Sequence, residues 1–110
     1  MKILRTTATH IMSKALHHRD SCMLGVMDEQ ENVFYAESAE EFDQLIARYP
    51  DSVWLYNQHP LATDKMDQMM PADGQRCIEI FQDTKGVFGL RAYDQQGKLQ
   101  TPIALEFEDD

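Results

Sequence analysis

The sequence predicts an α+β fold, in which residues 1–110 form a single domain with a mainly antiparallel sheet and two to three helices packed on one face. Three observations favour this class. The chain has 110 residues, which is enough for one hydrophobic core but not for two. Segments typical of strands outnumber segments with helical spacing. Short turn sequences join most of these strands, which indicates hairpins and therefore antiparallel pairing.

The first predicted element is a helix close to the start of the chain. Thr6 or Thr7 is expected to cap it. Its apolar residues recur at helical spacing and should form one buried stripe, which consists of Ala8, Ile11, Met12, Ala15 and Leu16.

Residues 22–36 are predicted to form a β-hairpin. The stretch SCMLGVMD is apolar on both faces, as in a central strand, DEQEN is a polar turn, and VFYAES is the return strand. Ser38 to Glu41 then reads as a capping box, in which the serine hydroxyl and the glutamate carboxylate satisfy free N–H groups of a second helix. Pro50 should end this helix. Its buried stripe is expected to consist of Phe42, Leu45, Ile46 and Tyr49.

The second half of the chain is predicted to be mostly strands. SVWLYN (52–57) is rich in strand-forming residues, and 65–70 has the methionine spacing of a short helix. The last third is expected to be a three-stranded meander of RCIEIFQ, GVFGLRAY and KLQTPIALEF, joined by the turns DTKG and DQQG.

The last predicted strand, Lys98 to Phe107, has a strict apolar alternation. Pro102 cannot donate to a ladder, which places this strand at a sheet edge. Edge strands present unpaired backbone groups, although Pro102 can guard against edge pairing. Because the row is apolar, we expect the chain to form a two-fold homodimer built mainly on side-chain burial at this strand. Packing of the row in the monomer's own core is the alternative.

The segment ALHHRDSCML (15–24) resembles a metal or catalytic cluster at first sight. Adjacent helical residues such as His17 and His18 point about 100° apart, and His10 lies roughly 10 Å along the axis from His17. These positions do not converge on one ion, so we expect no metal site. His17, His18 and Arg19 fit the last turn of a helix, where cations face the negative end of the dipole. A role for these histidines in a pH response stays open, as does any role of His10, His17, His18 or Cys22 beyond the helix end.

No catalytic motif is present, and we expect no cofactor. Cys22 and Cys77 lie in apolar strand patterns, which predicts reduced, slowly reacting thiols. Glu79 lies inside a strand, and Arg91 in the next strand is expected to face it as a cross-strand ion pair.

Trp54, Tyr56 and His59 form the best candidate for an aromatic binding site. Trp54 and Tyr56 share one strand face, and exposed aromatic residues beside methionines are typical of adaptable protein-binding surfaces. Packing in the core is the competing interpretation. The same group with Cys77 would line the pocket of a small dimeric α+β enzyme or ligand-binding domain, which is our second functional hypothesis.

The net charge of −9 is unevenly distributed. Residues 23–75 hold eleven acidic residues against two basic ones, whereas residues 1–22 are net basic. Such a charge disfavours nucleic acid and anionic lipid as partners. There is no apolar run long enough to span a bilayer and no signal-peptide pattern, so we expect a cytoplasmic protein.

Acidic residues cluster at three places: the first hairpin turn, the end of the sequence and the start of the capped helix. The last of these clusters consists of Glu37, Glu40, Glu41 and Asp43. We expect it to dock on a basic or mixed surface of a partner protein, although the helix dipole also favours acids there. The leading hypothesis is therefore a small non-enzymatic protein-binding module, such as an inhibitor, an immunity or antitoxin-like protein, or a bacterial or phage anti-defence protein.

Overall fold

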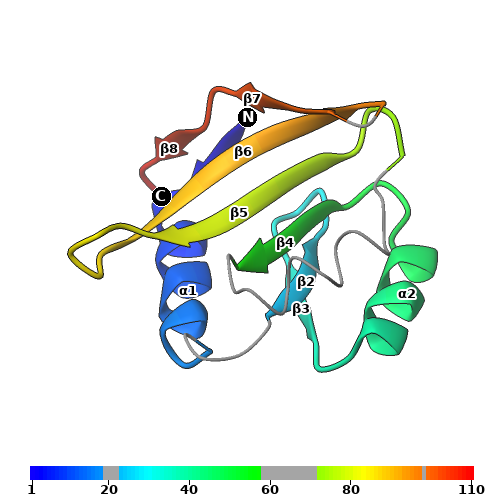
Figure 1. The fold of residues 1–110 in the computed structure, drawn as a ribbon, viewed down its shortest axis with the longest axis horizontal. Coiled ribbons are helices and arrows are strands. Elements are labelled where there is room, and N and C mark those ends of the chain that lie inside the picture. The colour runs from blue at the N-terminus through cyan, green and yellow to red at the C-terminus, as the bar shows by residue number, and fades with distance from the viewer. Residues whose placement is uncertain (19–22, 58–71, 98) are drawn as a thin grey trace.

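The computed structural model describes residues 1–18, 23–57, 72–97 and 99–110, and Figure 1 shows their arrangement. The predicted helix at 65–70 lies outside these residues, as do Cys22 and His59. The elements in chain order are β1 (Lys2–Leu4), α1 (Arg5–Leu16), β2 (Leu24–Met27), β3 (Val33–Ala36), α2 (Ala39–Arg48), β4 (Val53–Asn57), β5 (Arg76–Gln82), β6 (Phe88–Gln96), β7 (Leu99–Ile103) and β8 (Glu106–Glu108).

The main sheet has six strands in the order β3-β2-β4-β5-β6-β7. Every neighbouring pair is antiparallel except β4 and β5, which are parallel. A separate parallel pair joins β1 to β8. The mostly antiparallel α+β fold is therefore confirmed, as are the hairpin of β2 and β3 and the antiparallel order of β5, β6 and β7.

The two described helices cover opposite faces of the sheet, so the prediction that the helices share one face is wrong. The α1-side face is the aliphatic layer in which Ile11 packs with Leu55 and Ile78. The α2-side face is the layer in which Phe42 packs with Trp54 and Tyr56. All five residues of β4 are buried. A strand that is apolar on both faces needs cover on both, and α1 and α2 each supply one side (Figure 1).

The start of the chain also differs from the prediction, because the strand β1 precedes the first helix. Thr6 and Thr7 lie inside α1 rather than before it, and the N-cap residue is Leu4, whose side chain makes no capping hydrogen bond. Long-range partners replace a local cap. The Leu4 N–H donates to Glu31 Oε1 at 2.9 Å, and Thr6 Oγ1 donates to Asp110 Oδ2 at 2.6 Å.

The second helix follows its local signal. The Glu41 N–H donates to Ser38 Oγ at 3.1 Å, and Glu41 Oε2 accepts from the Glu37 N–H at 2.9 Å. The reciprocal bond thus reaches one residue further back than the usual capping box. Phe42 is fully buried, and the helix ends at Arg48, two residues before Pro50.

The last predicted strand is divided in two. β7 lies at the edge of the sheet, as Pro102 indicated, but β8 leaves the sheet and pairs with β1. The apolar row from 99 to 107 therefore does not lie on one face. Leu99 is 72 % exposed, whereas Leu105 packs against the α1-side core.

Candidate functional site

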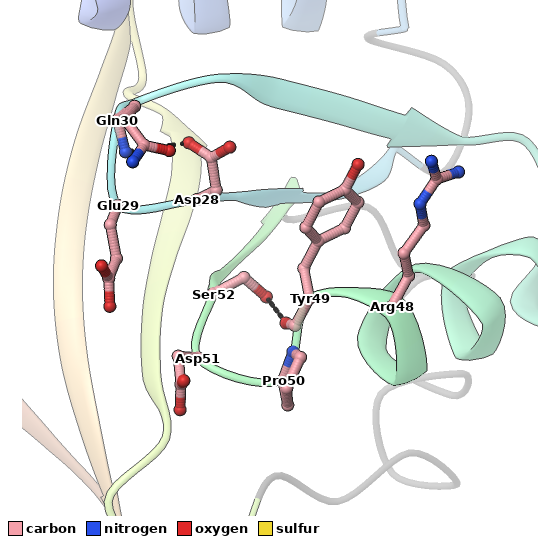
Figure 2. Close-up of a pocket in the computed structure, with 8 residues that line it drawn as sticks. All are labelled: Asp28, Glu29, Gln30, Arg48, Tyr49, Pro50, Asp51 and Ser52. Carbon is pink, nitrogen blue, oxygen red and sulfur yellow. Dashed lines mark hydrogen bonds between the residues drawn. The ribbon is translucent and has the colours of Figure 1, made fainter.

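Two adjoining pockets lie at the end of the sheet where the β2–β3 turn, the α2–β4 loop and the segment before β5 meet. Their volumes are about 310 and 470 Å³, and they share Glu29, Pro50, Asp51 and Ser52. We call this surface the acidic groove, because the side chains of Asp28, Glu29, Asp51 and Asp73 line it. Figure 2 shows the smaller of the two pockets.

The sheet topology explains why these loops meet. Because β4 and β5 are parallel neighbours, both strands start at the same end of the sheet. β2 is antiparallel to β4, with Met27 opposite Val53, so the last residue of β2 lies at that same end of the sheet. Three stretches far apart in the sequence are thereby placed side by side.

The β2–β3 turn is held by Asp28. Its Oδ1 accepts from the N–H groups of Gln30 at 3.0 Å and Asn32 at 2.8 Å, and Glu31 adopts a left-handed backbone conformation with φ of 62°. Desolvation acts to raise the pKa of Asp28, but the hydrogen bonds from Asn32 and Gln30 outweigh it, so the pKa is lowered. This turn therefore presents Glu29 on a fixed backbone, next to an ionised Asp28.

The α2–β4 loop is held by Tyr49 and Ser52. Ser52 Oγ donates to the Tyr49 carbonyl at 2.6 Å, and the Tyr49 ring stacks on Phe34 with a centroid distance of 4.6 Å. In Figure 2 the carboxylates of Glu29 and Asp51 extend from two different loops toward the same side, while the Arg48 guanidinium lies beyond Tyr49. The groove is thus lined by four acidic residues and by two basic ones, Arg48 and Arg76.

The segment before β5 adds the third acidic contribution. Asp73 Oδ1 accepts from the Gly97 N–H, the Gly74 N–H donates to the Gln95 carbonyl at 2.8 Å, and Gln75 Nε2 donates to the Ser52 carbonyl at 2.8 Å. These bonds join the segment to β6 and to the start of β4. Sequence reasoning singled out the acids of the hairpin turn but missed Asp51 and Asp73. Their signal was a turn sequence before each of two strands, Pro50-Asp51 and Asp73-Gly74.

The predicted cluster at the start of α2 lies elsewhere. Glu37, Glu40, Glu41 and Asp43 are all exposed. β3 leads away from the hairpin turn, so this cluster lies at the opposite end of the main sheet from the acidic groove. Glu41 is also engaged as the capping residue. The acidic cluster at the start of α2 and the acidic groove are therefore two separate surfaces.

The predicted aromatic group lies in the core. Trp54 and Tyr56 are buried under α2, and the Phe42 ring meets the Trp54 ring edge-on at 5.2 Å. The Tyr56 hydroxyl and the Gln100 side chain lie within hydrogen-bonding distance, at 3.1 to 3.3 Å. His59 lies outside the described residues. A binding role for this group stays a prediction.

Beside these aromatics, Tyr56, Glu79 and Arg91 occupy matching register positions on β4, β5 and β6. Glu79 is only 6 % exposed, and its Oε1 lies 3.9 Å from Arg91 Nη1, which confirms the cross-strand pair. Oε1 has no hydrogen-bond partner among the described residues. Burial raises the pKa of Glu79, and Arg91 opposes this only in part. The Arg91 guanidinium lies 4.0 Å from the Phe81 ring centroid.

Cys77 neighbours this group and is 1 % exposed. Burial raises the pKa of its thiol to about 12, with a further contribution from Asp94. The side chain is therefore a neutral thiol at physiological pH, whereas the reactive form of cysteine is the thiolate. This agrees with the expectation of an inert cysteine, which a reactivity measurement has yet to test.

The described histidines are spread along α1. The His17 N–H donates to the Lys14 carbonyl at 3.1 Å, which places His17 at the end of the helix as predicted. His10 lies 6.2 Å from the Tyr35 ring, and Lys14 Nζ lies 5.2 Å from the same ring. In the part of the chain that the structure describes, no three His, Cys, Asp or Glu residues converge as metal ligands would.

Comparison with protein family models and with curated proteins gives no match to this sequence. No helix formed by the described residues has the length and apolar character needed to span a membrane.

Proposed function

We propose that the protein is a protein-binding module that docks on a basic or mixed surface of a partner protein through the acidic groove. The observation that carries this proposal is the convergence of Glu29, Asp51 and Asp73 from three separate loops around two adjoining pockets. Pockets of this size fall in the range used for ligand recognition. Carboxylates at their rim suit the ammonium and guanidinium groups of lysine and arginine.

The state of the charges supports the groove over other acidic surfaces. Glu29 and Asp51 have no ion-pair partner among the described residues. The acids near the end of the sequence differ, because Glu106 and Glu108 pair with Lys2, and Asp109 pairs with Arg5. The acids at the start of α2 line neither of the two pockets. The groove combines unpaired charge with a concave shape, as inhibitors and immunity proteins would need against a basic target.

The test is co-purification from the native host with charge reversal at each acidic surface. The groove variant carries Glu29→Lys and Asp51→Lys, and the matched control carries Glu40→Lys and Asp43→Lys, with the same change in net charge. We expect the wild type and the control to retain a common partner at low salt and to release it at high salt. The groove variant should lose that partner at low salt.

Two results would overturn the proposal in different ways. If the control loses the partner while the groove variant keeps it, docking occurs at the start of α2, as the sequence pattern predicted. If no protein is retained by any of the three at low salt, the protein-binding role itself fails.

A second candidate function is the small dimeric α+β enzyme or ligand-binding domain with a site near Trp54, Tyr56, His59 and Cys77. The buried Glu79 Oε1 favours it, because this atom has no hydrogen-bond partner in the described ranges and can accept from a bound ligand. The neutral Cys77 thiol argues against nucleophilic catalysis there. A screen of small amines by thermal shift tests it, since a ligand of this site should stabilise the wild type but not Glu79→Gln.

A further inference from the structure

The contact between β8 and β1 is small and polar at its surface. Three residue pairs form it in parallel, with Lys2 opposite Glu106, Ile3 opposite Phe107 and Leu4 opposite Glu108. All three residues of β8 are exposed, whereas Ile3 beneath them is buried. Figure 1 shows β8 beside β1 after the chain has left the edge strand β7.

Opposite charges fix this contact. Lys2 Nζ lies 4.0 Å from Glu106 and 3.8 Å from Glu108, and Arg5 Nε lies 2.6 Å from Asp109. α1 has no acidic residue in its first turn, so Asp109 and Asp110 supply the negative charge that a helix start favours. Exposed ion pairs contribute little net stability and are screened by salt. The ion pairs of the segment 106–110 are therefore complementary but weak, and the backbone pairing with β1 adds to them, including the bond from the Glu106 N–H to the Met1 carbonyl at 2.8 Å.

The break between β7 and β8 follows Pro102, which lacks a ladder donor, but it has no turn-forming residue of its own. It falls at Ala104 and Leu105, and neither is a turn-forming residue. The apolar alternation of Leu99, Thr101, Ile103, Leu105 and Phe107 runs through the break without interruption. Local preference therefore favours one continuous strand, while the folded monomer requires a change of direction. Such a conflict is typical of segments that exchange between copies of a chain.

We propose that β8 is an exchangeable segment and that its alternative acceptor is β1 of a second copy of this chain. In the exchanged dimer each copy places its acids 106–109 on Lys2 and Arg5 of the other, so the ion pairs of the monomer are kept. The strand from Leu99 to Glu108 becomes continuous, which satisfies the local preference. Reciprocal exchange of this kind closes on itself and gives a two-fold dimer. This interface does not depend on the acidic groove.

The test is charge complementation between two variants of the full chain. Variant A carries Lys2→Glu and Arg5→Glu, and variant B carries Glu106→Lys, Glu108→Lys and Asp109→Lys. In each variant alone, the β8 segment meets like charge within its own chain. After the two are refolded together, each β8 segment meets opposite charge on the other chain. We expect sedimentation to show monomers for each variant alone and a 1:1 heterodimer in the mixture.

Matched controls separate exchange from general attraction. One control pair carries the same charge changes elsewhere: Arg48→Glu and Lys85→Glu in one chain, with Glu37→Lys, Glu40→Lys and Asp43→Lys in the other. That mixture should contain several-fold less heterodimer. A mixture of A and B that stays monomeric, or a control pair that associates equally, would overturn the proposal.

A hinge variant provides a test that needs no charge change. Two glycines inserted between Ala104 and Leu105 remove the local preference for a straight strand and make closure within one chain easier. We expect the dimer fraction of the otherwise wild-type chain, refolded at hundreds of micromolar, to fall several-fold. The same insertion after Lys85, in the β5–β6 turn, should leave the dimer fraction unchanged. A wild-type chain that is monomeric under these conditions would also count against exchange.

Discussion

The two faces of the main sheet are buried by different chemistries. On the α1-side face, α1 presents small and aliphatic residues, Ala8, Ile11 and Ala15, to a layer of valine, leucine, isoleucine and methionine. On the α2-side face, Phe42 meets a layer that contains Trp54, Tyr56 and Cys77. Buried titratable groups, including Glu79, lie on the second face.

The two faces should therefore differ in how their contributions to the free energy of unfolding depend on pH. The α1-side face carries one titratable group packed against its apolar core, the phenol of Tyr35, whose pKa burial raises to about 12, so its contribution to the free energy of unfolding should not vary with pH near neutrality. The α2-side face holds a carboxyl, a thiol and a phenol whose pKa values are all raised by burial. A response to pH near neutrality within the described core is therefore expected from the α2-side face, where Glu79 lies.

Truncating the central helix residue on each face should produce the largest effects. We expect Phe42→Ala to lower the free energy of unfolding by about 3–5 kcal/mol and Ile11→Ala by about 2–5 kcal/mol, because both side chains are fully buried. Urea titrations measure both values. Losses below about 1 kcal/mol at Ile11 would mean that α1 does not anchor its face.

Removing the cap of α2 should have the next largest effect. Ser38→Ala deletes the acceptor of the Glu41 N–H and should cost about 1 kcal/mol. Thr6→Ala is the matched change on α1, where no local side-chain cap exists. Thermal unfolding should show the smaller loss for Thr6→Ala. Equal losses would contradict the view that α2 begins with a local side-chain cap and that α1 begins through contacts with residues distant in the sequence.

Glu79 should make stability depend on pH in a direction set by its raised pKa. As the pH rises above the ordinary glutamate range, the unfolded chain ionises first, and the folded state loses stability until its own carboxyl ionises. Glu79→Gln lacks this loss. Its stability relative to wild type should therefore increase from pH 4 to pH 7, as followed by urea titration at each pH. A constant difference would show that the Glu79 carboxyl is not desolvated.

The smallest effect is expected at the start of α1. Asp109→Asn removes an exposed ion pair with Arg5 and one negative charge near the helix start. The loss should be less than about 1 kcal/mol at low salt and should vanish in concentrated NaCl. Asp83→Asn changes a turn acid that no described ion pair involves, so its effect should not show this salt dependence. A salt-independent loss at Asp109 would assign it a structural rather than an electrostatic role.

The elements with local signals could be predicted, whereas those fixed by distant partners could not. Ser38, Glu41 and Pro50 lie within thirteen positions of one another, and they correctly predicted α2. α1 begins through contacts with Glu31 and Asp110, which no local pattern could reveal. β1 likewise exists as a strand only because β8 pairs with it.

The placement of the helices and of the site depended on topology in the same way. The sequence of β4 left open whether both of its faces are buried, and it does not say which helix covers which face. The acidic groove depends on the parallel pairing of β4 and β5, which brings Asp51 and Asp73 to the same end of the sheet. A sequence that suggests hairpins gives no sign of one parallel pair among them. The Glu79–Arg91 pair was predictable because its hairpin register follows from a short turn.

The pairing of β1 with β8 also has a consequence for the order of folding. Arg5 and Asp109 are 104 residues apart in the chain, whereas the hairpins of the main sheet close over a few residues. The entropic cost of loop closure rises with the length of the loop, so the hairpins are expected to form early and this pairing last. Substitutions in β8 should then accelerate unfolding while leaving the refolding rate nearly unchanged. The β1–β8 pairing would then form only after the rest of the described molecule has folded.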